Sequence, residues 1–322
     1  MANSTNAAEK TRLPGLYVAG ATAIVSGISV FVNSYGVKSF QSPAVYTTAK
    51  NLAATLVIAA FVALAWLATR GEGRDARRTT EPAAPTSSRP LSGVARLAGF
   101  AYVAAIGGGA AFILFFDGLA RTSAVPAVFL HDTLVIWVAL AALPLLGERL
   151  GPWNLAAIAL LVVGVTATSG GVGHLVVDSG NALVLAATIL WAIEAVIAKR
   201  LLAGITPSGL ALVRMGGGAV VLVGYLGATG QFHTLVGLGG SGLRWALVTG
   251  CLLGGYVTTW MTALSRARAV DVTSVLVASA AVTIFLDTVV HHTGLASDTV
   301  GLVLLALGVA AVVRAWPRVA RA

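Results

Sequence analysis

The sequence predicts an all-α polytopic membrane protein of about ten transmembrane helices, arranged as two inverted five-helix repeats. Three observations lead to this fold class. Apolar side chains make up 57% of the chain and charged ones only 10%, with a mean hydropathy of +0.88, whereas about a quarter of the residues of soluble domains are charged. The apolar residues gather in runs of about 20, the length that crosses a bilayer. The spacing of several residues recurs in both halves of the chain.

The apolar runs are the ten candidate spans. They cover residues 15–35, 43–68, 97–119, 123–146, 153–170, 180–202, 206–229, 245–264, 269–290 and 298–316. Most connections between them are short, so consecutive helices should be antiparallel. Residues 69–95 are the exception, because they are rich in Arg, Pro, Ser and Thr. Such a composition cannot bury a core and predicts a mobile loop.

These spans divide the chain into four predicted parts. The parts are a tail over 1–13, a first repeat over 14–172 that includes the loop, a second repeat over 178–316 and a tail over 317–322. Lys10 and Arg12 before the first apolar run resemble the start of a signal peptide. No small-residue cleavage site follows Val32, which favours an uncleaved first helix.

The net charge of +9 could indicate a nucleic-acid partner. The basic residues lie in short tracts between apolar runs, however, and the positive-inside bias of membrane proteins explains that placement better. With the N-terminus inside, sixteen of them fall on inner segments and only Lys38, Arg121 and Arg244 on outer ones. The inner set is Lys10, Arg12, Arg70, Arg74, Arg77, Arg78, Arg89, Arg96, Arg149, Lys199, Arg200, Arg266, Arg268, Arg314, Arg318 and Arg321. Both termini are therefore predicted to be cytoplasmic, in the cell membrane.

An internal repeat supports the five-plus-five arrangement. Pro43 opens the second run and Pro207 the seventh, and Lys50 and Arg214 follow them at the same distance, so both pairs are 164 residues apart. An odd number of spans in each copy gives the two copies opposite orientations in the membrane. Inverted repeats of this kind are typical of transporters, with a binding site near the midplane between them.

Three sequence patterns point to a known family. Residues 119–127 read LARTSAVPA, an apolar run then ends at 146–150 with LGERL, and the next closes with Gly164-Val165. The first pattern recurs weakly at 264–270. Together these patterns resemble the EamA-like branch of the drug/metabolite transporter superfamily.

This resemblance covers residues 14–316. It implies ten spans and the movement of small metabolites, amino acids or drugs, often by export, but it names no substrate. The second copy departs from the pattern, because His292-Thr293 stand where Gly147-Glu148 would recur.

Five ionisable residues are predicted to lie deep in the bilayer, where each costs several kcal/mol unless it is paired or hydrated. Lys50 and Asp132 have similar depths from the outer face and are expected to pair, as are Glu194 and Arg214 from the inner face. His131 is a candidate proton or ligand group because imidazole titrates near neutral pH. All five are candidate substrate or coupling residues. The alternative is that they only lock helices together.

Other polar and small residues have simpler interpretations. Glu148 precedes the fifth run and is interpreted as structural, and Asp117 and Arg121 should form a surface pair one helical turn apart. The glycines 107–109 and 216–218 should allow close helix packing, with bending during gating as the alternative.

The leading functional hypothesis is a secondary transporter, an exporter that works by alternating access. The alternatives are a membrane-embedded enzyme and a non-transporting scaffold. The sequence has no diphosphate, zincin, nucleophile-elbow or P-loop motif, which disfavours an enzyme. The lone Cys251 excludes an intramolecular disulfide. We expect no cofactor, no metal and no nucleic acid. The expected partners are a small-molecule substrate, the lipid bilayer and protons, with a homodimer as an option.

Overall fold

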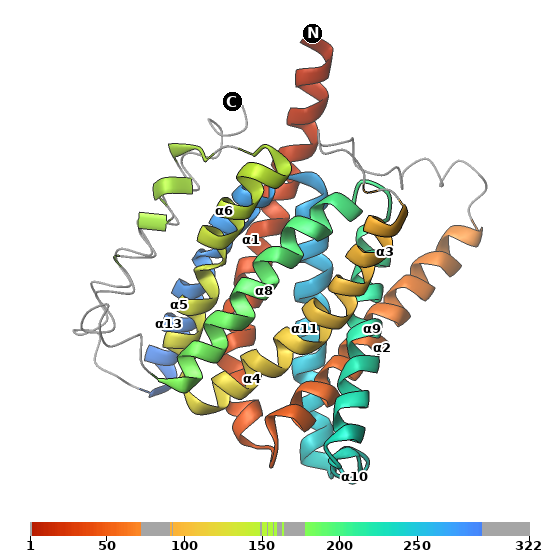
Figure 1. Ribbon diagram of the computed structural model, residues 1–322, viewed down its shortest axis with the longest axis vertical. Coiled ribbons are helices and arrows are strands. Elements are labelled where there is room, and N and C mark those ends of the chain that lie inside the picture. The colour runs from red at the N-terminus through yellow and green to blue at the C-terminus, as the bar shows by residue number, and fades with distance from the viewer. Residues whose placement is uncertain are drawn as a thin grey trace.

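The computed structural model describes residues 2–71, 91, 93–148, 150–152, 154–156, 158–159, 163 and 178–291. These residues form a bundle of long helices that run between two opposite ends of the molecule (Figure 1). The first half contains α1 (Ala2–Lys38), α2 (Pro43–Gly71), α3 (Gly93–Tyr102), the π-helix η2 (Val103–Ala110), α4 (Ala111–Arg121), α5 (Ala124–Asp132) and α6 (Leu134–Leu146). The second half contains α8 (Ser179–Leu201), α9 (Pro207–Ala228), α10 (Phe232–Val236), α11 (Gly240–Arg266), α12 (Ala269–Leu276) and α13 (Ala278–His291).

Eight stretches of these described residues are long and apolar enough to cross a membrane. Three of them are composite: α3, η2 and α4 form one span, α5 and α6 another, and α12 and α13 a third. The prediction of an all-α polytopic membrane protein is confirmed. The predicted fifth span, 153–170, lies mostly outside the described residues, and the tenth, 298–316, lies wholly outside them. Most of the predicted 69–95 loop also falls outside.

Local sequence signals explain several helix ends. The Thr206 hydroxyl accepts a hydrogen bond from the Gly209 N–H at 3.2 Å, and Pro207 occupies the first position of α9, where its missing N–H costs nothing. Gly147 ends α6 with a φ of 68°, a conformation that favours glycine. The short helix α10 between α9 and α11 was not predicted.

Two spans are interrupted near their middle, one in each half of the chain. Thr133 separates α5 from α6, and Val277 separates α12 from α13. The Thr133 hydroxyl donates to the Leu130 carbonyl at 2.6 Å, which competes with the helical pattern. The helices α5 and α12 begin 145 residues apart, which is the offset that the sequence predicts for this part of the repeat. Broken helices at matching places often mark the binding site of a transporter.

The predicted packing role of the glycines is confirmed where η2 meets α9. A Cβ atom on Gly108 would overlap the Arg214 carbonyl oxygen, and one on Gly218 would overlap the Gly108 carbonyl. Two backbones can approach this closely only where both positions lack a side chain.

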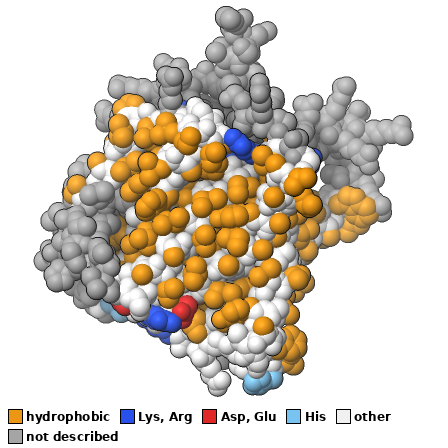
Figure 2. Space-filling model, in the orientation of Figure 1, with side chains coloured by type: hydrophobic (Ala, Val, Ile, Leu, Met, Phe, Trp, Pro, Cys, Tyr) orange, Lys and Arg blue, Asp and Glu red, His pale blue; other side chains and the backbone are white. Residues whose placement is uncertain are grey.

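Hydrophobic side chains cover the face seen in Figure 2, and its charged side chains lie near the upper and lower margins. The exposed apolar side chains include Leu56, Leu64, Val220 and Leu247, each of which has more than half of its surface exposed. An apolar belt of this kind suits contact with lipid tails rather than with water.

Candidate functional site

A small cavity lies inside the bundle, where α4, α5, α6, α8, α9 and α11 meet. Its lining residues are Phe112, His131, Leu134, Trp191, Glu194, Arg214, Tyr256 and Trp260. The cavity volume of about 40 Å³ has room for a few waters but not for a metabolite. The structure therefore shows this region in a closed state.

The predicted pair of Glu194 and Arg214 is confirmed and faces this cavity. The guanidinium donates from Nε to Oε1 at 2.5 Å and from Nη2 to Oε2 at 3.0 Å. The two residues are only 2% and 3% exposed. Arg214 also lies over the Phe112 ring, 5.1 Å from its centre. Such a two-point geometry is among the strongest that a carboxylate and a guanidinium can form.

Gly107 makes room for this ion pair. A Cβ atom at that position would overlap the Glu194 carboxyl group. The Gly107 carbonyl accepts a hydrogen bond from Trp191 Nε1 at 2.9 Å, which fixes the indole in the cavity wall. The glycine run therefore serves the site as well as helix packing, a role that sequence reasoning missed.

Asp132 lies at the break in the α5–α6 span and reaches the break in the α12–α13 span. Its carboxylate accepts from the Ser279 hydroxyl at 2.9 and 3.1 Å and from the Ala280 backbone N–H. It is 1% exposed. Asp132 therefore caps the first turn of α13 from the other half of the chain. Sequence reasoning also missed Ser279. This residue could have been suspected because it lies close to the position that matches Asp132 in the second repeat.

The predicted pair of Lys50 and Asp132 is wrong, because no ion pair joins these residues within the part of the chain that the structure describes. Lys50 Nζ donates instead to Asn33 Oδ1 at 2.9 Å and lies 4.0 Å from the centre of the Phe116 ring. Tyr46 donates to the same Asn33 oxygen. A similar depth along two helices does not determine which way each side chain points.

His131 is packed edge-on against two aromatic rings. The centres of the Phe115 and Trp191 rings lie 5.8 and 5.6 Å from that of the imidazole. Its Nδ1 makes no hydrogen bond with the described residues and lies 3.6 Å from Asp132 Oδ1. His131 is therefore packed among aromatic rings, and its role as a proton or ligand group stays a prediction.

The aromatic wall completes the site. Tyr256 and Trp260 stack on each other with ring centres 6.2 Å apart, and they line the cavity together with Phe112 and Trp191. Sequence reasoning missed this pair, although its spacing of one helical turn places both rings on one face of α11. Within the described residues, no group of three His, Cys, Asp or Glu could hold a metal.

A model of the EamA-like transporter family matches this sequence twice, over residues 13–170 and 178–314. This chain belongs to the EamA-like transporter family. The double match also shows that the chain contains two copies of the family unit, as the repeated spacing predicted. The family lies within the drug/metabolite transporter superfamily, as the sequence patterns indicated.

Solved structures agree with this fold. One crystal structure, titled only "Crystal structure of protein", superposes with a TM-score of 0.64 at 18% identity and covers 96% of this chain and 99% of its own. At 18% identity, this similarity shows that the two chains share a fold and nothing further. No match is found among curated proteins.

Proposed function

We propose that this EamA-like protein is a secondary transporter that exports a small metabolite, an amino acid or a drug-like solute across the cell membrane. The observation that carries the proposal is the closed cavity, which contains a buried ion pair and four aromatic rings in a membrane-spanning bundle. Burying charges inside a membrane span is costly, so ionisable residues there are candidates for function. Substrate binding is such a function, because Glu194 and Arg214 present opposite charges to a solute that carries both an ammonium and a carboxylate group.

Alternating access between inverted copies is the mechanism that fits this site. The cavity takes residues from both family units: Phe112, His131 and Leu134 come from the first, and the other five come from the second. Motion of one unit against the other would therefore open the cavity toward one side of the membrane and then the other. The broken spans at Thr133 and Val277 supply places where such motion can bend a helix.

We assign proton coupling to Asp132 and His131. Within the described residues, Asp132 has no Lys or Arg within 4 Å, whereas the charge of Glu194 is matched by Arg214. Asp132 is thus a deeply buried acid whose charge no Lys or Arg of the described residues balances within 4 Å, and proton binding can neutralise it. Lys50 lies outside the cavity lining, and its ammonium group contacts the Phe116 ring instead.

The test is transport by purified protein in lipid vesicles with an imposed pH gradient. The probes are radiolabelled amino acids and the fluorescent cation ethidium, ranked first by the thermal shift each gives. We expect at least one probe to move faster than in empty vesicles, and Asp132→Asn to abolish the stimulation by the gradient. Asp117→Asn is the matched control, because that acid pairs with Arg121 at a helix end, and it should leave transport unchanged.

Two results would contradict the proposal. If no probe moves faster than in empty vesicles, the transporter assignment fails. If Asp132→Asn transports at the normal rate with the normal pH dependence, the carboxylate is structural and the coupling assignment fails, while the transporter class stands.

The proposed orientation places the ends of α6 and α8 in the cytoplasm, from the sixteen-to-three charge count. In a protein with Cys251→Ser, Gly204→Cys should react with an impermeant maleimide only from the cytoplasmic side, and Gln41→Cys only from outside. Both positions are exposed and lie in connections at opposite ends of the bundle. Labelling of both from the same side would contradict the topology.

A further inference from the structure

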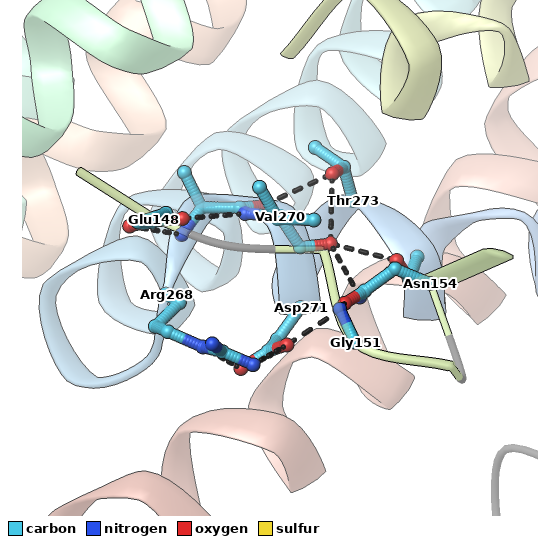
Figure 3. Close-up of polar contacts among 9 residues, drawn as sticks. Glu148, Gly151, Asn154, Arg268, Val270, Asp271 and Thr273 are labelled. Atoms are coloured by element: carbon cyan, nitrogen blue, oxygen red, sulfur yellow. Dashed lines mark hydrogen bonds and ion pairs between the residues drawn. The ribbon is translucent and has the colours of Figure 1, made fainter. Parts of the chain in front are cut away.

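A polar network closes the end of the bundle where α6 and α8 end and α12 begins, which we call the Glu148 face. Glu148 Oε1 accepts a hydrogen bond from the Ala269 N–H at 3.0 Å, and Oε2 accepts one from the Val270 N–H at 3.0 Å. In Figure 3 the Glu148 carboxylate points at the start of α12. A carboxylate at a helix N-terminus satisfies orphan N–H groups and meets the positive end of the helix dipole.

A second residue of the first family unit holds the same helix. Asn154 Nδ2 donates to Ser274 Oγ at 2.8 Å, and its Oδ1 accepts from the Gly151 N–H at 2.7 Å. Asn154 also lies 3.4 Å from Asp271 Oδ1, and Arg268 binds that carboxylate at two points, both 2.8 Å (Figure 3). The first turns of α12 are therefore anchored to the other unit.

Basic side chains of α8 tie further helix ends together on this face. Lys199, only 2% exposed, donates to the carbonyls of Leu264 at 2.5 Å and Ala267 at 2.7 Å. Arg200 donates to the Leu145 carbonyl at the end of α6. The cavity residue Glu194 lies about one and a half helical turns before these cations on α8, so the Glu148 face is the end of the bundle next to this side of the cavity.

The two acids of the first unit act on the two halves of one broken span. Glu148, partly exposed, caps α12, and Asp132, 1% exposed, caps α13. At the edge of the bundle, water can take over the hydrogen bonds that Glu148 makes. Breaking the buried hydrogen bonds of Asp132 costs much more free energy, because water does not reach them. If the hydrogen bonds of Glu148 break while those of Asp132 persist, α12 can move away from the Glu148 face while α13 stays in place.

The two family units differ in sequence at the position of this acid. The position 145 residues after Glu148 is Thr293, so the second unit has no acid at the equivalent place. Loss of Glu148 should therefore destabilise closure of one face without an equal effect on the other.

We propose that Glu148 is a releasable latch that holds the Glu148 face closed over the cavity. This inference rests on the proposed transport function, because a latch implies a state in which that face opens. If Glu148 were only structural, its loss would lower the stability of the fold. If Glu148 is a latch, its loss also makes residues behind the Glu148 face more accessible to solvent.

The test is the reactivity of a buried reporter in purified protein with Cys251→Ser. Ala263→Cys is the reporter, since Ala263 is fully buried and lies on α11 between the cavity residue Trp260 and the helix end at Arg266. An impermeant maleimide should label it roughly five- to thirtyfold faster when Glu148→Ala is added, the range that one or two kcal/mol of lost closure implies. Glu148→Gln keeps one acceptor and should give a smaller increase.

Thr206→Ala is the matched control, because Thr206 caps α9 on the same face but within one unit. It should leave the labelling rate unchanged. Equal rates with and without Glu148→Ala would overturn the latch, and so would an equal increase in the control variant, which would indicate general loosening. Labelling needs no substrate, so these results are separate from the vesicle assay, whose failure would overturn the transporter assignment instead.

Discussion

Replacing Arg214 with glutamine should lower the free energy of unfolding by about 3–5 kcal/mol, one of the two largest effects that we expect in this chain. The change leaves the Glu194 carboxylate buried at 2% exposure without the guanidinium that now binds it at two points. An uncompensated buried charge loses most of its hydration and gains no partner in exchange. The measurement is reversible unfolding in mixed micelles.

A double-mutant cycle separates this pair from its surroundings. Glu194→Gln should also be costly, but the double variant should lose much less than the sum of the two single losses, because it leaves no unpaired charge. Additive losses would show that the two residues contribute independently and would contradict the pairing.

The exposed pair of Arg121 and Asp117 is the matched comparison. It has the same residue types, with a contact of 2.6 Å, but its side chains are 51% and 34% exposed. Arg121→Gln should cost at most about 1 kcal/mol, because solvent screens an exposed pair. A similar loss for both arginines would mean that burial does not set the cost.

Gly108→Ala should be the second severe change, with a loss of about 3 kcal/mol, at the upper end for overpacking. The new Cβ would overlap the Arg214 carbonyl oxygen, and backbone atoms cannot rotate away as a flexible side chain can. The helices η2 and α9 would have to separate, which would also disturb the ion pair that Arg214 forms. The same unfolding measurement checks this loss.

Gly224→Ala on α9 is the control, because nothing lies within 4 Å of a Cβ atom there. It should be neutral or slightly stabilising, since alanine is the better helix former. Gly218→Ala should resemble Gly108→Ala, and the double variant should cost less than the sum, because both changes separate the same two backbones. A mild effect at Gly108 would contradict the close packing.

The contacts of Glu148 show what a sequence motif leaves undetermined. The order Gly147-Glu148 was predicted to be structural, and the structure confirms a structural contact: glycine ends α6 and glutamate caps α12. What the motif alone could not reveal was that the capped helix belongs to the other family unit, 121 residues further along the chain. A contact between units can change when the units move.

The site was predicted in part. Glu194 and Arg214 pair as expected, and the absence of a side chain at Gly107 of η2 leaves the room in which the carboxylate meets the guanidinium. Lys50 and Asp132 have similar predicted depths, but Lys50 faces Asn33 and Phe116 while Asp132 faces Ser279. Depth follows from counting residues, whereas direction around a helix depends on which neighbours pack against it.

By itself the sequence determined the membrane class, the positions of the eight described spans and the repeat. These properties follow from local chemistry, because an apolar run of sufficient length is stable in lipid only as a helix whose backbone groups are all satisfied. Only the tertiary structure decided which aromatic rings line the cavity, which acid caps which helix and where the spans break. Those features depend on contacts between residues more than a hundred positions apart, such as Asp132 with Ser279. The residues that surround each of them in the sequence do not indicate which distant residue will be its partner.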